Sequence, residues 1–108
     1  MTKKSNYSIP TQLIYGKFET DKWDYSNHII PPMTLSSSFR LHSAERGAEA
    51  FSQFGEINPH DPQYFYQRMG EPNKDMLEES LAIAEGGECC LTFASGMGGC
   101  DVSSNFFL

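Results

Sequence analysis

The feature that most constrains this chain is the regular pattern of its last third. Apolar residues recur at helical spacing over 74–85, and Gly86-Gly87 follows, supplying the residue type that most easily ends a helix. Residues 88–94 are then mostly apolar, as in a buried strand. The small residues of 95–99 close that run and favour a turn. We therefore expect a helix over 74–85, a strand over 88–94 and a second helix beginning at about Gly96.

The order helix, strand, glycine-containing turn and helix is how an α/β domain begins. Before the first helix, Pro72 offers a turn and Asn73 an N-cap. The turn Ser95-Gly96-Met97 follows the carboxyl end of the strand, where such domains bind ligands. Its backbone N–H groups could donate to an anion, and the helix behind it adds the positive end of its dipole. A phosphate site is thus available to the turn, although a purely structural turn with glycine fits the same pattern.

Residues 1–70 show no such period, because prolines separate short apolar and aromatic clusters. We interpret 1–70 as an extended N-terminal arm and 71–108 as the incomplete start of a domain. A short helix between Ala44 and Phe54, capped by Ser43, is the one exception. Aromatic residues without periodicity need a surface to lie on, and we expect that surface to come from outside this chain. The residues concerned are Trp23, Tyr25, Phe51 and Phe54.

Composition excludes several classes of function. The net charge of −6 argues against a nucleic-acid partner. No run approaches the roughly 18 apolar residues of a membrane span, and the polar start does not resemble a signal core. We therefore expect no nucleic acid, no membrane and a cytoplasmic location. Cys89, Cys90 and Cys100 are an odd number, and sequence neighbours rarely bridge, so we expect reduced thiols that serve in packing.

Metal and thiol chemistry are also disfavoured. His28, His42 and His60 are scattered without metal-ligand spacing, and the chain has no Cys-x-x-Cys pair, so we expect no metal site. A Cys/His nucleophile is possible in principle. Cys90, however, falls in the expected buried strand, where a thiol is usually inert.

A longer series of motifs is more specific than any of these signals. In order, the chain contains Ile30-Pro31-Pro32, Ser36-Ser37-Ser38-Phe39, Tyr66-Gln67-Arg68, Glu71-Pro72-Asn73, Leu77-Glu78, Leu81-Ala82-x-x-Glu85-Gly86-Gly87 and Ser95-Gly96-Met97. In this order and at this spacing they resemble the trans-sulfuration family of pyridoxal-phosphate (PLP) enzymes, of the cystathionine γ-synthase and methionine γ-lyase type. The resemblance runs from about Leu13 to about Gly99. It implies the α/β fold of the aspartate aminotransferase-like (type I) PLP-dependent transferases, of which this chain would be an N-terminal, truncated fragment.

The resemblance also implies roles for five residues. Tyr66 and Arg68 match a Tyr-x-Arg motif that, in the family, reaches across a dimer interface to the PLP phosphate of the other subunit. Gly96 and Met97 match a pair whose backbone amides bind that phosphate within their own subunit, with Ser95 beside them. A guanidinium suits this role because it presents paired donors to a phosphate. The alternative is an arginine on a loop beside a carboxylate, with the tyrosine packed under the arm.

Departures from the family pattern limit the inference. The family's Asn-Pro-Thr reads Glu71-Pro72-Asn73, and after Met97 the match decays into residues that form helices poorly, as a frameshift or an altered end near residue 99 would produce. PLP chemistry needs a lysine that binds the cofactor covalently. None of the five lysines lies in a motif resembling that site, so no catalytic residue is assigned. We expect the chain alone to be inactive.

Two functions remain open. The first is a fragment of a PLP-dependent C–S lyase or transferase of sulfur amino-acid metabolism. It would work by γ-elimination or γ-replacement on a small sulfur or O-activated amino acid, within a homo-oligomer (dimer or tetramer). The second is a non-catalytic interaction module that docks on a full-length relative or another partner. In either case we expect no stable monomeric domain from the chain alone, because its one strand has no predicted neighbour.

Overall fold

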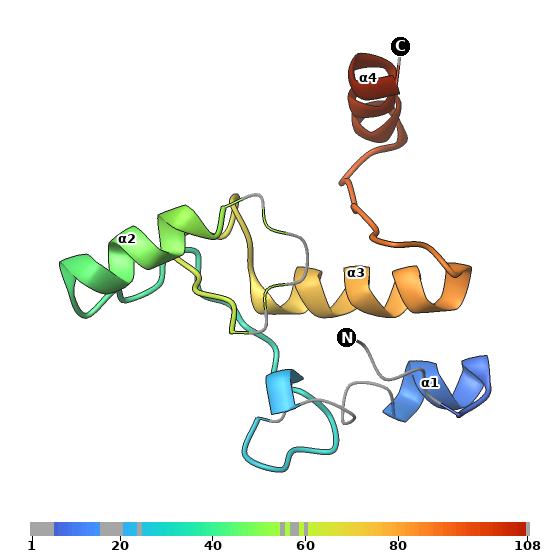
Figure 1. Cartoon of the computed structure of the whole chain (residues 1–108), viewed down its shortest axis with the longest axis horizontal. Coiled ribbons are helices and arrows are strands. Elements are labelled where there is room, and N and C mark those ends of the chain that lie inside the picture. The colour runs from blue at the N-terminus through green and yellow to red at the C-terminus, as the bar shows by residue number, and fades with distance from the viewer. Residues whose placement is uncertain are drawn as a thin grey trace.

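The computed structural model describes residues 6–15, 21–23, 25–54, 56, 59 and 61–107. The described elements are α1 (Ile9–Tyr15), the short 3-10 helix η2 (Asp21–Trp23), α2 (Ala44–Ser52), α3 (Pro72–Glu85) and α4 (Gly96–Phe107). Figure 1 shows α3 in the middle, with α1 along one side of it and α4 standing apart at the end of the following connection. Helix α3 is therefore the element to which the rest of the chain is attached.

Both ends of α3 follow from local chemistry. The Glu71 side chain accepts a hydrogen bond from the Lys74 backbone N–H at 2.8 Å, and Pro72 occupies the first turn, where its missing N–H costs no helical bond. Gly86 has a φ of 67°, the left-handed conformation that ends a helix. The predicted end is confirmed, but the start lies before residue 74. Asn73 is not the N-cap, because Glu71 takes that role.

Instead, Asn73 attaches the arm to α3. Its side-chain oxygen accepts from the backbone N–H of Thr34 at 3.3 Å, and its amide donates to the Thr34 carbonyl at 3.1 Å. This pair satisfies both backbone groups of one arm residue, as a strand neighbour would. The Asn73 side chain thus makes the two hydrogen bonds to Thr34 that a neighbouring strand would otherwise make.

Trp23 corrects the expectation that the arm's aromatic residues find no surface in this chain. It is 3% exposed, its indole N–H donates to Glu79 of α3, and Lys22 pairs with the same carboxylate. No local pattern predicts this contact, because Trp23 and Glu79 lie 56 positions apart in the chain. Phe51 also has a neighbour in the chain, since it stacks on Phe65 with ring centroids 4.2 Å apart, although Phe51 itself is 62% exposed.

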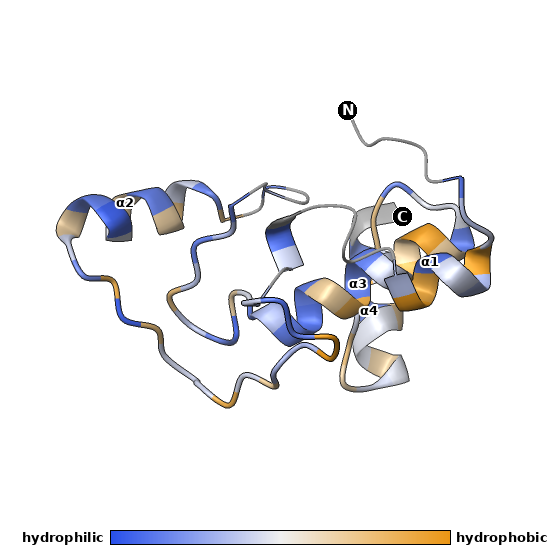
Figure 2. Ribbon diagram, turned by 90° about the horizontal axis from the view of Figure 1, so that it is seen from below, coloured by the Kyte–Doolittle hydropathy of each residue, from blue (hydrophilic) through white to orange (hydrophobic). Residues whose placement is uncertain are grey.

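The arm is not uniformly extended. Helix α2 confirms the predicted short helix, with the Ser43 hydroxyl accepting from the Arg46 N–H at 3.2 Å. Helix α1 was not expected. It has seven residues, too few for a stable isolated helix, and its contacts with α3 are what stabilise it. Figure 2 shows hydrophobic residues on α1, where Ile9, Leu13 and Ile14 remain 45–62% exposed.

The strand expected over 88–94 is absent from the described structure. That segment is neither helix nor strand, and the sheet-like pairing recorded in the described residues is one isolated antiparallel bridge between Ser38 and Tyr66. A buried strand needs neighbours on both edges, and none is present here. Leu91 consequently remains 65% exposed.

The cysteines are free thiols, as predicted, but Cys89 and Cys100 are exposed and only Cys90 is partly covered. The expected packing role was therefore wrong for Cys89 and Cys100, because the described part of the chain forms no layer over these two thiols. No helix in the described part of the chain is both long and apolar enough to cross a membrane.

Candidate phosphate-binding site

The turn Ser95-Gly96-Met97 leads directly into α4, and the second predicted helix is confirmed by it. The Ser95 hydroxyl accepts from the Gly98 N–H at 3.1 Å, and the Ser95 carbonyl accepts from the Gly99 N–H at 3.3 Å. Among the described residues, no acceptor is recorded for the N–H groups of Gly96 and Met97. These are the donors that the first turn of a helix leaves unsatisfied.

Gly96 and Met97 are both exposed. A Cβ placed on Gly96 would meet nothing within 4 Å, and Met97 is 79% exposed. Helix α4 has twelve residues, so its aligned peptide dipoles place partial positive charge at this end. The turn can therefore donate two backbone hydrogen bonds to an anion, which is how helix N-termini bind phosphate.

The second predicted group, Tyr66 and Arg68, lies on a turn just before α3. The Gln67 N–H donates to the Ser37 carbonyl at 2.8 Å, and the Met69 N–H donates to the Tyr66 carbonyl at 2.9 Å. The Arg68 guanidinium carbon lies 5.5 Å from the centroid of the Tyr66 ring. Arg68 is exposed, and the described residues show no ion pair to it.

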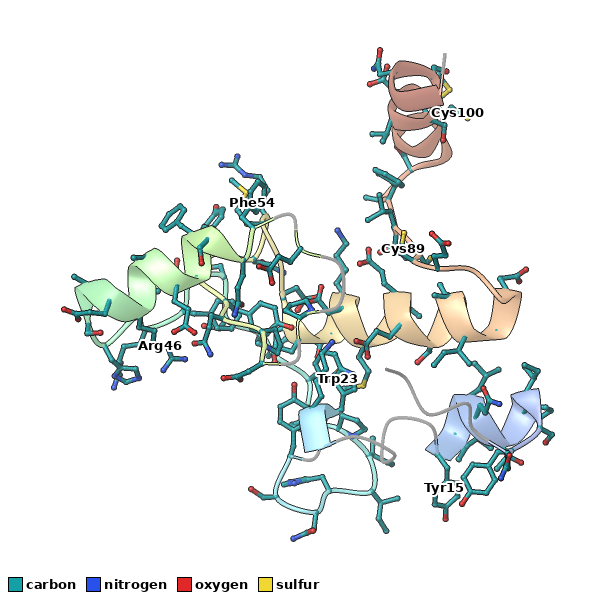
Figure 3. All side chains as sticks on the ribbon, viewed as in Figure 1. Tyr15, Trp23, Arg46, Phe54, Cys89 and Cys100 are labelled. Atoms are coloured by element: carbon teal, nitrogen blue, oxygen red, sulfur yellow. The ribbon has the colours of Figure 1, made fainter. Side chains whose placement is uncertain are left out.

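The two groups are not brought together within the chain. Residues 66–68 precede α3, whereas residues 95–97 follow the connection that leaves its other end (Figure 1). Among the described residues, no hydrogen bond, ion pair or ring contact joins one group to the other. Figure 3 likewise shows α4 with Cys100 separated from the side chains around α2 and the start of α3.

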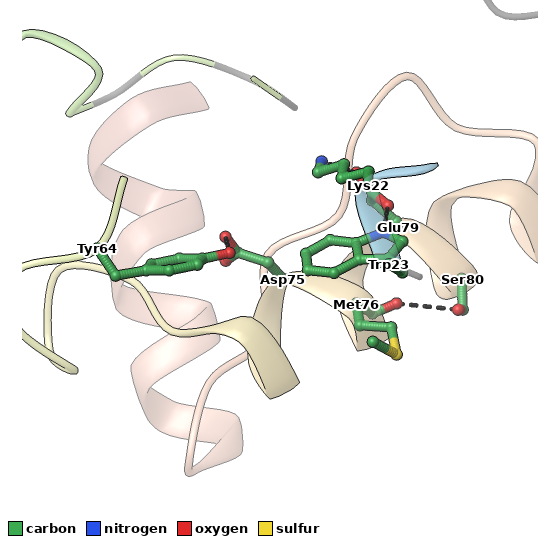
Figure 4. Close-up of polar contacts among 7 residues, drawn as sticks. All are labelled: Lys22, Trp23, Tyr64, Asp75, Met76, Glu79 and Ser80. Atoms are coloured by element: carbon green, nitrogen blue, oxygen red, sulfur yellow. Dashed lines mark hydrogen bonds and ion pairs between the residues drawn. The ribbon is translucent and has the colours of Figure 1, made fainter. Parts of the chain in front are cut away.

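A partly buried acidic face of α3 was missed by reasoning from the sequence. The Tyr64 hydroxyl donates to Asp75 at 2.7 Å, and Lys22 and Trp23 bind Glu79 one turn later (Figure 4). Burial raises the pKa of the Tyr64 hydroxyl, and the hydrogen bond to Asp75 raises it further. Burial also raises the pKa of the Asp75 carboxyl, against the opposing effect of the Tyr64 hydrogen bond. The i, i+4 spacing of Asp75 and Glu79 was the available signal.

These carboxylates are structural, because each is occupied by a side chain of the arm. The lysines that can be placed are occupied as well: Lys22 binds Glu79, and Lys74 lies 3.6 Å from Glu78. Lys3, Lys4, Lys17 and His60 lie outside the described residues. No cluster of metal-ligating side chains occurs in the described ranges. The free donors of the site are therefore the amides of Gly96 and Met97 and the guanidinium of Arg68, a set suited to a phosphate.

Comparison with known proteins points the same way. The family model described as Cys/Met metabolism PLP-dependent enzyme matches residues 10–108, and so extends past Gly99, where the recognisable motifs end. The L-methionine gamma-lyase of Pseudomonas putida is 37% identical over 72% of this chain and 18% of its own length. The cystathionine beta-lyase of Bacillus subtilis is 32% identical over 97% of this chain and 22% of its own. The chain thus spans about a fifth of these curated relatives. No solved structure gives a significant match.

Proposed function

This chain belongs to the Cys/Met metabolism PLP-dependent enzyme family, and from that premise we propose that it supplies the phosphate-binding turns of a PLP site in a C–S lyase or transferase acting on sulfur amino acids. Membership implies the aminotransferase-like fold. Within that fold, residues 71–108 would begin the large, PLP-binding domain, and residues 1–70 would form the arm.

One observation carries the proposal: the N–H groups of Gly96 and Met97, for which the described residues record no acceptor, lie exposed at the start of a twelve-residue helix. A phosphate is the part of PLP that such a turn recognises. When bound, PLP supplies the electron sink on which elimination or replacement at an amino acid depends. In this proposal the N–H groups of Gly96 and Met97 bind and orient the phosphate, and the Ser95 hydroxyl lies close by.

The separation of Arg68 from Gly96 supports a site shared between two subunits. An exposed arginine with no carboxylate partner among the described residues is available to a phosphate in a neighbouring molecule, and Tyr66 keeps its hydroxyl-bearing ring beside it. Part of the arm also remains uncovered. Four of its large apolar side chains are at least 80% exposed, namely Ile29, Ile30, Met33 and Leu35. A homo-oligomer in which the arm lies on a second subunit would cover them.

The experiment compares two substitutions at Gly96 in the assembled PLP-loaded enzyme. Gly96→Pro removes one N–H at the first helical position, where proline is tolerated, and Gly96→Ala keeps the N–H and meets no neighbouring atom. We expect Gly96→Pro to raise the PLP dissociation constant about tenfold or more, as loss of a hydrogen bond to a charged group requires, and Gly96→Ala to leave it nearly unchanged. Equal dissociation constants for the two variants would refute the phosphate role of the turn.

A second comparison tests Arg68 against its neighbour in sequence. Arg68→Ala should weaken PLP binding by about 1.5–3 kcal/mol, whereas Gln67→Ala should not, because the bond from Gln67 to Ser37 is made by the backbone. Mixing subunits that carry Arg68→Ala with subunits that carry Gly96→Pro then tests sharing. A mixed dimer should regain one intact site and bind one PLP tightly. Mixed dimers without a tight site would show that both groups act within one subunit.

A further inference from the structure

Glu78 joins α3 to the connection that carries the phosphate-binding turn. Its Oε1 accepts from the Thr92 backbone N–H at 2.8 Å and from the Thr92 hydroxyl at 2.9 Å. In the described chain, these are the side-chain hydrogen bonds recorded between α3 and residues 88–95. The Glu78 side chain is only 15% exposed, and the Lys74 ammonium lies 3.6 Å from the same oxygen. Two hydrogen bonds to one carboxylate oxygen hold Thr92 in a single position.

From Thr92 the contacts continue to the start of α4. Phe93 lies against the first turn of that helix: a Cβ on Gly98 would be 3.8 Å from the Phe93 Cβ, and a Cβ on Gly99 would be 3.5 Å from its ring. Extensive packing between helices in the described chain is recorded for α1 with α3, and not for α4. The direction of α4 relative to α3 therefore depends on the connection, and within it on Thr92 and Phe93.

We propose that Glu78 is a positioning residue for the phosphate-binding turn, which sets through Thr92 and Phe93 the direction in which the N–H groups of Gly96 and Met97 point. The inference rests on the proposed function. Glu78 does not touch the phosphate. It holds the turn in place before the anion arrives, so that less conformational freedom is lost on binding.

A purely helical role for Glu78 would come from its i, i+4 pair with Lys74. The conservative variant separates the two roles. Glu78→Gln removes the charge of that pair but keeps an oxygen that can accept from Thr92, whereas Glu78→Ala removes both. Glu85→Ala is the matched control, because Glu85 is an exposed acidic residue seven positions later on the same helix face.

The first measurement is hydrogen exchange at the Thr92 amide in the full chain. We expect slow exchange in the wild type and in Glu78→Gln, and exchange about tenfold faster or more in Glu78→Ala, because the amide loses its acceptor. Glu85→Ala should behave as the wild type. Equal Thr92 exchange rates in Glu78→Ala and Glu85→Ala would overturn the proposal at this step.

The second measurement is the PLP dissociation constant of the assembled enzyme. Glu78→Ala should raise it about tenfold, Glu78→Gln about threefold at most, and Thr92→Val by an intermediate factor, because valine keeps the backbone bond. The double variant Glu78→Ala/Thr92→Val should bind no more weakly than Glu78→Ala, since both changes remove the same interaction. If Glu78→Ala does not fold, the PLP dissociation constants of Thr92→Val and Glu85→Ala are compared instead. Equal values for these two variants would overturn the positioning role.

The outcomes distinguish this inference from the function on which it rests. If Gly96→Pro leaves PLP affinity unchanged, the proposed function fails and the positioning role falls with it. If Gly96→Pro weakens binding but Glu78→Ala binds PLP as tightly as Glu85→Ala, only the positioning role fails. A Glu78→Gln variant as weak as Glu78→Ala would assign the effect to charge and would also overturn the positioning role.

Discussion

The chain on the two sides of Gly86 is held together in different ways. Before Gly86, the arm is attached to α3 by side-chain hydrogen bonds from Trp23, Lys22 and Tyr64 and by the pair between Thr34 and Asn73. After Gly86, Glu78 makes the side-chain hydrogen bonds recorded from α3 to the following connection. The residues classed as buried among those described all precede Gly86.

The difference shows what a single helix can and cannot organise. A helix face with spaced acidic groups can bind an irregular arm, because each arm residue needs only one partner. An apolar segment such as 88–94 needs backbone partners along its length and cover on both faces, which one helix does not supply. The first region is therefore formed by contacts within the chain. The second exposes its apolar residues and its helix N-terminus.

The largest effect that can test this comparison is expected at Trp23. Trp23→Ala should lower the free energy of unfolding by about 3 kcal/mol or more, because it removes a buried indole and leaves Glu79 without one donor. Leu91→Ala, at an exposed position after Gly86, should cost less than about 0.5 kcal/mol. Urea denaturation followed by far-ultraviolet circular dichroism measures both. Similar losses would mean that the two regions are equally well packed.

A smaller effect is expected at the boundary itself. Gly86→Ala should destabilise the end of α3 by about 1 kcal/mol, because its φ of 67° is unfavourable for any residue with a Cβ. Gly87→Ala is the control, since Gly87 lacks a positive φ. Hydrogen exchange of the last turn of α3 should accelerate in Gly86→Ala and not in Gly87→Ala. Equal acceleration would show that the left-handed conformation does not determine where the first region ends.

The smallest effect is a pH dependence confined to the first region. Burial raises the pKa of Asp75 in the folded chain, so the folded state holds a proton that the unfolded state releases near the ordinary value of about 4. The contribution of Asp75 to folding stability is therefore complete below about pH 4, and it is lost as the pH rises through the raised pKa of Asp75. Asp75→Asn keeps an acceptor for Tyr64 and lacks this loss. We therefore expect the unfolding free energies of the wild type and of Asp75→Asn to diverge as the pH rises above about 4. Parallel curves of unfolding free energy against pH would contradict the raised pKa of Asp75.

Local signals accounted for much of the fold. Ser43, Gly86 and Ser95 mark the start of α2, the end of α3 and the start of α4, because capping involves groups only a few residues apart. Helix α1 could not be predicted in this way. Its seven residues show no stable local pattern, and its stability comes from α3, more than fifty positions away.

For the candidate site, the motifs identified which residues to consider but not how they lie. The resemblance to the family pointed to Gly96 and Met97, and a helix N-terminus explains why their N–H groups can donate to an anion. No sequence pattern predicts the hydrogen bonds from Thr92 to Glu78, since a glutamate on an amphipathic helix is usually solvated. The separation of Arg68 from Gly96 likewise appears only when both turns are placed around α3.

By itself, the sequence determined the family, the starts of α2 and α4 and the end of α3, because motifs and caps are properties of neighbouring residues. Only the tertiary structure decided which acidic residue of α3 meets which part of the arm. Those contacts join residues 11 to 57 positions apart, and no local preference selects among the carboxylates that could accept them. Packing made the selection, since burying Trp23 against α3 places its N–H at Glu79.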